Sequence, residues 1–156
     1  MQPAAHPSPM ESPRPDILLV EDSASDAELA MHALQGCGGA RRVIRVRDGA
    51  EALDFLFGTG RYRGRDPHNV PRCILLDLKL PKVDGLQVLA ALRADARTRT
   101  VPCVVLSSSR EAADVHRCYE LGANSYVVKP VDFEQFARAI QRIEAYWLAV
   151  NEPDCP

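Results

Sequence analysis

Four short apolar segments of this chain each run into side chains that can bind phosphate or a divalent cation. The segments span 17–20, 73–76, 104–106 and 126–128, and the polar residues that follow them are Glu21 with Asp22, Asp77, Ser107 and Lys129. Runs rich in Val, Ile and Leu are typical of parallel strands that are buried on both faces. Because functional groups of such sheets gather beyond the carboxyl ends of the strands, these side chains are expected to converge. The pattern indicates a phosphoryl site centred on Asp77.

The carboxylates of this set suit Mg²⁺, which prefers near-octahedral oxygen ligands and keeps several of its waters. We expect Asp22 and Asp77 to supply direct ligands, and Glu21 to hold the ion through water. The backbone carbonyl of Lys79 is a further candidate ligand. Asp77 is the candidate nucleophile for an incoming phosphoryl group, which gives an aspartyl phosphate. The metal and the Lys129 ammonium would neutralise the charge that develops on the phosphoryl oxygens.

Each of these residues, taken alone, also has an ordinary structural explanation. Acidic residues at strand ends are common as solvated caps, and Ser107 can simply begin a turn. A single lysine is usually solvated, but the chain has only three, and Lys129 stands between a Val-Val pair and a proline. The occurrence of such residues at four successive strand ends favours the functional interpretation.

The elements that would position these groups alternate between strand and helix patterns five times. Strands are predicted near 16–20, 42–46, 73–77, 103–107 and 125–129, and helices are predicted after Asp22 and near 49–57, 84–95, 110–121 and 133–150. Ser23 or Ser25 can cap the first helix, and the glycine-rich residues 36–39 can end it in a left-handed turn. This alternation predicts an α/β fold with a doubly wound, five-stranded parallel sheet and helices on both faces.

The last predicted helix has the most regular apolar stripe. Its members are Phe133, Phe136, Ile140, Ile143, Trp147 and Val150. Most of these positions are expected to pack on the sheet. A single domain rarely needs so long a stripe, so its far end, Tyr146, Trp147 and Leu148, is a candidate partner interface, because Trp and Tyr often anchor interfaces.

Composition and length describe one globular domain. With 156 residues, 46% apolar content and a net charge of −2, the chain has no global attraction to nucleic acid or membrane. Five cysteines without a C-x-x-C pair predict neither a disulfide framework nor a zinc site. Since neither a signal peptide nor a membrane-spanning run is present, we expect a cytoplasmic protein. Residues 1–15 are a predicted disordered, proline-rich tail, 16–150 the folded domain, and 151–156 a short second tail.

Across nearly all of 16–150, the chain resembles bacterial response-regulator receiver domains. The matching segments are Leu19-Val20-Glu21-Asp22, Leu76-Asp77-Leu78-Lys79-Leu80-Pro81 with Asp84-Gly85, Leu106-Ser107, and Tyr126-Val127-Val128-Lys129-Pro130. The resemblance implies a flavodoxin-like strand order of 2-1-3-4-5 and transfer of phosphoryl to Asp77 from a histidine kinase. The implied Mg²⁺ site consists of Glu21, Asp22, Asp77 and the Lys79 carbonyl. The resemblance further implies that Ser107 and Tyr126 rearrange as a switch and that Lys129 pairs with the phosphoryl group. It also implies a cis peptide bond between Lys129 and Pro130.

Within this family, the chain is most similar to stand-alone receivers paired with bacterial phytochrome kinases. The similarity lies in the insertion that runs from Phe55-Leu56-Phe57-Gly58 to Pro71, in Ser107-Ser108-Ser109 and in Tyr146-Trp147-Leu148. It implies a light-sensing kinase partner and a homodimer through the fourth helix, fifth strand and fifth helix. Two residues depart from the common pattern: Ser107 stands where Thr is commoner, and Lys79 is bulkier than its usual counterpart. We hypothesise that Lys79 hinders hydrolysis of the aspartyl phosphate.

Three functions of different classes remain open from the residues. The first is a signalling module, not an enzyme, that changes its protein partners on phosphorylation or passes the phosphoryl group onward; the six residues after Val150 are too few for an effector domain. The second is a phosphatase of the haloacid-dehalogenase type. That mechanism requires an Asp two positions after the nucleophile as general acid, and this chain has Lys79 at that position. The third is a nucleic-acid-binding module that uses the arginines near 61–65, although direct DNA binding is not expected at this net charge.

Overall fold

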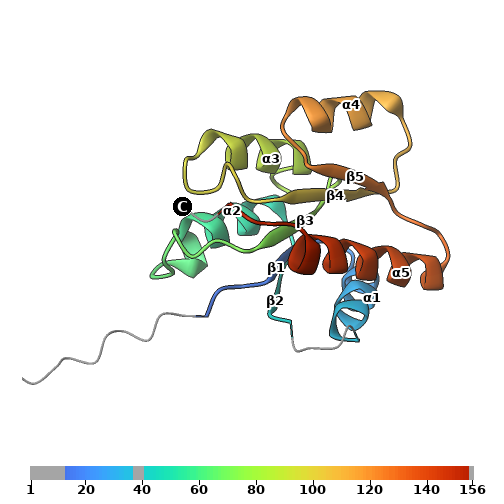
Figure 1. Cartoon of the computed structure of the whole chain (residues 1–156). Coiled ribbons are helices and arrows are strands. Elements are labelled where there is room, and N and C mark those ends of the chain that lie inside the picture. Colours follow the sequence, from blue (N-terminus) through green and yellow to red (C-terminus); the bar gives the residue numbers. More distant parts are fainter. Residues whose placement is uncertain (1–12, 37–40, 155–156) are drawn as a thin grey trace, which may run out of the picture.

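The computed structural model describes residues 13–36 and 41–154, which form one five-stranded parallel sheet with helices on both faces (Figure 1). The strand order is β2-β1-β3-β4-β5, as predicted. The strands are β1 (Ile17–Val20), β2 (Val43–Val46), β3 (Cys73–Asp77), β4 (Cys103–Ser107) and β5 (Ser125–Val128). The helices are α1 (Ala24–Gln35), α2 (Gly49–Phe57), η1 (Gly60–Tyr62), α3 (Gly85–Ala94), α4 (Ala112–Glu120), α5 (Phe133–Glu144) and η2 (Ala145–Val150).

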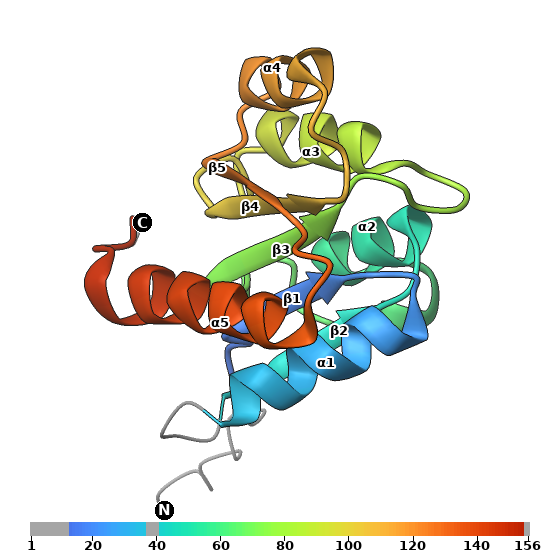
Figure 2. The same cartoon turned by 90° about the vertical axis from the view of Figure 1, so that its right-hand side faces the viewer.

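Successive strand residues point to opposite faces of the sheet and build two separate cores. On β1, Ile17 and Leu19 pack toward α1 and α5, whereas Leu18 and Val20 pack toward α2, α3 and α4. Figure 2 shows α1 and α5 side by side on one face of the sheet, with α2 and α3 beyond it. Since both faces of the central strands are covered, their residues are apolar without alternation, which is why continuous runs predicted them.

Side-chain caps begin most of the helices and thereby set the loops that carry the functional groups. Ser23 accepts a hydrogen bond from the Asp26 amide at the start of α1, and Asp84 forms a reciprocal capping box with Gln87 at the start of α3. The predicted left-handed end of α1 is not seen at Gly36, whose φ of −76° is right-handed. The remaining residues of that predicted turn, 37–39, lie outside the described residues.

The last helix departs from the predicted stripe after Glu144. Phe136, Ile140 and Ile143 are buried, but Phe133 and Val150 at the two ends of the stripe are about 70% exposed, at 71% and 70%. The chain continues as the π-helical segment η2, in which the Asn151 amide bonds to the Tyr146 carbonyl, five residues earlier. The wider turn shifts the helix face that meets the core, so Leu148 is buried in place of Val150.

The structure describes residues 13–15, which precede the predicted start of the folded domain at residue 16. Pro15 is buried, and Arg14 donates a hydrogen bond to the Val70 carbonyl at 2.9 Å. Residues 1–12, which make up most of the predicted amino-terminal tail, lie outside the described residues. Within the described ranges, no helix is both long enough and apolar enough to cross a membrane.

Candidate metal and phosphoacceptor site

Strand register brings three carboxylates together at the carboxyl edge of the sheet. Val20 pairs with Leu76, so the residues that follow β1 lie beside Asp77 at the end of β3. Carboxylate oxygens of Glu21, Asp22 and Asp77 all lie within 4.8 Å of one another. The Asp22 side chain is exposed, that of Asp77 is 12% exposed, and Glu21 is buried. The predicted cluster therefore forms, with one end open to solvent.

The Lys129 ammonium lies among these carboxylates. Its Nζ contacts Glu21 Oε1 at 2.5 Å, Asp26 Oδ2 at 3.0 Å and Asp77 Oδ2 at 3.4 Å. Burial by itself would lower the pKa of Lys129, but the hydrogen bonds and charges of Glu21, Asp77 and Asp26 outweigh it and raise the pKa above its ordinary value. The side chain is only 12% exposed and carries a permanent positive charge at neutral pH. It can thus stabilise an anion that forms on Asp77.

The pKa of Glu21 is strongly raised in this site. Burial, and then the hydrogen-bonded Asp77 carboxylate, raise its pKa from 4.5 to about 7, while Lys129 opposes this rise. Two carboxylates this close cannot both ionise freely in a partly dehydrated site. A divalent cation would remove that conflict, since it favours the ionised form of every ligand.

The donor set fits Mg²⁺. All candidate ligands are hard oxygens, and two oxygens bound to one Mg²⁺ at about 2.1 Å lie roughly 3–4 Å apart, a spacing that small side-chain movements could reach from the observed limit of 4.8 Å. Two or three carboxylates leave room for waters and one phosphoryl oxygen. The Lys79 amide donates to Asp77 Oδ1 at 3.4 Å, which holds the backbone of Lys79 beside the nucleophile.

A hollow of about 420 Å³ lies above the site. It is lined by Asp22, Leu78, Lys79, Leu80, Pro81, Asp84, Leu86, Ser107 and Asp114. This volume admits a phosphoryl group with its waters, and the exposed Lys79 side chain stands at its edge. Asp22, Lys79 and Ser107 therefore border one open space, whereas Asp77 and Glu21 are not among the residues that line it.

Ser107 and Tyr126 are joined through the loop that follows β4. The Ser107 side chain is buried and accepts a hydrogen bond from the Ser109 amide at 3.1 Å, while the Tyr126 hydroxyl donates to the Ser109 carbonyl at 2.9 Å. The Ser107 hydroxyl accepts from that amide and still has its own O–H to donate to a phosphoryl oxygen. Both side chains bond the backbone of Ser109, so the two predicted switch residues share one structural element.

The expected cis bond between Lys129 and Pro130 is wrong for this structure. Among the described residues, no peptide bond is cis. The trans form already lets the Lys129 amide bond to the Ser107 carbonyl at 2.8 Å and lets Nζ reach the carboxylates. Because an X–Pro bond prefers trans by only about 0.5–1 kcal/mol, such tertiary contacts decide the isomer.

Two functional-site contacts were missed by the sequence reasoning. Asp26 on α1 holds Lys129, and Arg45 on β2 donates to the Glu21 carbonyl at 3.2 Å and 3.3 Å and to the Asp22 carbonyl at 3.5 Å. The available signal was the position of Asp26 in the first turn of the helix predicted after Asp22, which keeps its carboxylate close to the end of β1. Arg45 gave no such signal, since only the strand order places β2 beside β1.

The predicted interface residues behave differently from one another. Tyr146 is 49% exposed and stacks edge-to-face on the half-buried Trp147, with ring centroids 4.9 Å apart. Leu148 does not fit the expectation of an interface residue: its side chain is 6% exposed and belongs to the core between the sheet, α1 and α5. Because the π-helical turn rotates Leu148 inward, only Tyr146 and part of Trp147 are available to a partner.

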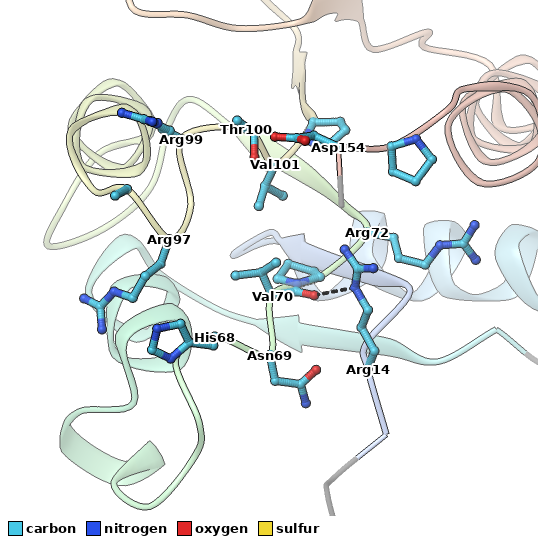
Figure 3. A pocket seen from close by; sticks show the side chains of 14 residues that line it. Arg14, His68, Asn69, Val70, Arg72, Arg97, Arg99, Thr100, Val101 and Asp154 are labelled. Carbon is cyan, nitrogen blue, oxygen red and sulfur yellow. Dashed lines mark hydrogen bonds between the residues drawn. The ribbon is translucent and has the colours of Figure 1, made fainter. Parts of the chain in front are cut away.

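A second, larger hollow of about 580 Å³ lies at the opposite edge of the sheet (Figure 3). Arginines border it, but their side chains do not converge on one point. Arg72 pairs with Asp16 at 3.3 Å, and Arg97 pairs with Asp95 at 2.8 Å. In the 58–71 insertion, Arg65 stacks on Phe55 and Arg61 pairs with Glu51 at 3.4 Å, whereas Arg63 is exposed.

Comparison with known proteins agrees with this geometry. Residues 17–141 match the response regulator receiver domain, and the chain belongs to this family. It is a response regulator of a two-component system, the class of protein that receives phosphoryl groups from histidine kinases.

Two individual proteins of this family are similar to the chain over most of their length. The chain is 41% identical to the probable methanogenesis regulatory protein FilR2 of Methanothrix harundinacea over 90% of this chain and 88% of that protein. It is 39% identical to the response regulator Rcp1 of Synechocystis sp. over 85% and 88%, respectively. A Mn²⁺-bound crystal structure of Rcp1 superposes with a TM-score of 0.82, at 37% identity over 89% of this chain and 98% of that one.

Two solved phytochrome response regulators are also similar. The phosphorylated cyanobacterial protein RcpA superposes with a TM-score of 0.85 and 36% identity, covering 92% of this chain and all of that one. The bacteriophytochrome response regulator AtBRR is 50% identical, with a TM-score of 0.69, and the match covers 90% of this chain and all of AtBRR. The similarity therefore extends over the full receiver fold.

Proposed function

We propose that Asp77 is the phosphoacceptor of this response regulator and that Glu21, Asp22 and Asp77 hold the Mg²⁺ that the reaction needs. The observation that carries the proposal is the convergence of three carboxylates within 4.8 Å, with Lys129 Nζ in contact with two of them. When bound, Mg²⁺ supplies positive charge to the phosphoryl oxygens. The Lys79 carbonyl is a further candidate ligand.

The residues of the chain have distinct tasks in this reaction. One Asp77 oxygen attacks phosphorus while the bond from phosphorus to the kinase imidazole nitrogen breaks. Lys129 then turns its hydrogen bond from the carboxylate to a phosphoryl oxygen. Ser107 donates its O–H to another phosphoryl oxygen, and because its Oγ and the Tyr126 hydroxyl both bond the backbone of Ser109, a shift of Ser107 toward the phosphoryl group is passed to Tyr126.

The chemistry can be tested with a small phosphoryl donor. The protein is incubated with Mg²⁺ and acetyl phosphate, and its intact mass is measured. We expect a gain of one phosphoryl group in the wild type, none in Asp77→Asn, and none in the wild type with EDTA. A mass gain in Asp77→Asn would contradict the assignment of the acceptor.

We further propose a bacteriophytochrome histidine kinase as the partner. The proposal is supported by the 50% identity to AtBRR over the whole of that chain. Two apolar side chains that follow Lys129 closely in the sequence, Val131 and Phe133, are 96% and 71% exposed, and Phe133 borders a hollow with residues of α1. A kinase helix that delivers phosphoryl to Asp77 would cover them. Phosphotransfer from a purified phytochrome kinase, compared with kinases of other sensor classes, tests this pairing.

A homodimer through α4, β5 and α5 is also proposed. β5 ends the sheet, so one side of its backbone has no partner strand. On α4 only Cys118 is buried, and Tyr119 is 49% exposed, which leaves an uncovered face beside the edge strand. Tyr146 lies on the segment that continues α5. Light scattering with and without acetyl phosphate measures the mass in solution, and Tyr119→Glu should lower the dimer fraction; an unchanged monomer mass throughout would contradict the dimer.

A further inference from the structure

The Lys129 ammonium has all three of its N–H donors directed at carboxylates. Two of these acceptors, Glu21 and Asp77, belong to the proposed metal site, and the third, Asp26, does not. Asp26 lies on the first turn of α1, and its side chain is 37% exposed. An ammonium has no fourth donor, so a new acceptor must displace an existing one.

The carboxylates differ in how they respond to phosphorylation. Mg²⁺ would draw on Glu21 and Asp77, and phosphorylation removes the negative charge of the Asp77 carboxylate itself. Asp26 takes no part in either step, so its charge remains, and in this structure it lies 3.0 Å from Nζ. It therefore competes with the phosphoryl oxygens for the Lys129 ammonium and repels them as a like charge.

We propose that Asp26 is a positioning residue that draws Lys129 toward α1 and thereby destabilises the phosphorylated state. This inference rests on the proposed function of Asp77. Asp26 acts through the position and charge of Lys129 and does not touch the reacting atoms. Its effect is to weaken the binding of a phosphoryl group, or of a phosphoryl mimic, relative to a chain with a neutral residue at this position.

Beryllofluoride, which occupies the place of a phosphoryl group on a carboxylate, provides an equilibrium test in the presence of Mg²⁺. Asp26→Asn removes the charge but keeps an oxygen acceptor for Lys129. We expect it to bind beryllofluoride about three- to tenfold more tightly than the wild type, the size expected for one partly screened charge at this distance. The aspartyl phosphate formed with acetyl phosphate should be longer-lived by a similar factor. Asp26→Ala, a good helix former, should act in the same direction.

Glu28→Gln is the matched control. Glu28 lies on the same helix, is exposed, and makes no hydrogen bond or ion pair within the described residues. It should leave the affinity within twofold of the wild type. The gain of Asp26→Asn should also shrink between about 0.05 M and 1 M salt, because the Debye length falls to about 3 Å. A purely structural defect would not respond to salt in this way.

Each result bears on the inference. An Asp26→Asn affinity within twofold of the wild type, or weaker than it, overturns the role of Asp26, and so does an equal gain in Glu28→Gln. A wild type that binds no beryllofluoride and gains no phosphoryl mass overturns the proposed function itself. Failure of the two ideas is therefore distinguishable.

Discussion

The crowding of carboxylates around Asp77 predicts that removing its charge stabilises the metal-free protein. On a scale with an effective dielectric constant of about 20, two charges 4.8 Å apart repel by at least ~3.5 kcal/mol. Asp77 faces two such partners, Glu21 and Asp22. Its attraction to Lys129 at 3.4 Å is worth about 5 kcal/mol on the same scale. Repulsion exceeds attraction by roughly 2 kcal/mol before solvent screening.

Asp77→Asn should therefore raise the free energy of unfolding by ~1–2 kcal/mol at pH 8, low salt and excess EDTA. Urea unfolding can be followed by the fluorescence of Trp147, the only tryptophan. Adding Mg²⁺ at about ten times its Kd should stabilise the wild type by ~1.4 kcal/mol and the variant by less, so that the difference narrows. Glu28→Gln is the control for a general charge effect.

The reasoning would be refuted if Asp77→Asn were less stable than the wild type in EDTA, or if Glu28→Gln produced the same gain. A difference that widened on adding Mg²⁺ would also contradict it, because the variant lacks one proposed ligand.

Three further predictions follow from other parts of the structure. The folded metal-free protein keeps the proton of Glu21 up to about pH 7, whereas the unfolded chain loses it near 4.5. The free energy of unfolding should therefore fall, by at most ~3 kcal/mol, as pH rises from about 5 to 8. Urea unfolding in EDTA that shows stability rising over this range would contradict the prediction. Arg93 donates to four backbone carbonyls and to Asn124 Oδ1, so Arg93→Ala should lower the free energy of unfolding by ~3 kcal/mol. The control Arg138→Ala, at an exposed position without a partner in the described residues, should stay within ~0.5 kcal/mol. Lys79→Ala should shorten the lifetime of the aspartyl phosphate severalfold, as followed by intact mass after removal of the donor, and a lifetime equal to the wild type would exclude a shielding role.

Two of the central strands were predictable to the residue because their apolar runs end at functional residues, whereas β1 begins one residue later than predicted. β3 and β4 match the predicted 73–77 and 103–107, and the strand order follows from the family resemblance. The site residues were found from their positions after strands, and the structure does bring Glu21, Asp22, Asp77 and Lys129 together.

What sequence reasoning missed depends on contacts between distant elements. The inward turn of Leu148 needs a π-helical step that a periodic stripe does not reveal. The trans state of Lys129–Pro130 depends on a small free-energy difference that tertiary contacts decide. The role of Asp26 appears only when β5 brings Lys129 against α1. These are the places where a local pattern is compatible with more than one packed arrangement.

The ammonium of Lys129 acts as a resident counterion for this acidic edge. Folding should not require a bound metal, because Lys129, between β5 and α5, already places one positive charge among the carboxylates. Magnesium starvation should consequently leave a folded but unresponsive regulator. Restoring the ion would return signalling within the time of ion binding, with no need for new synthesis or refolding.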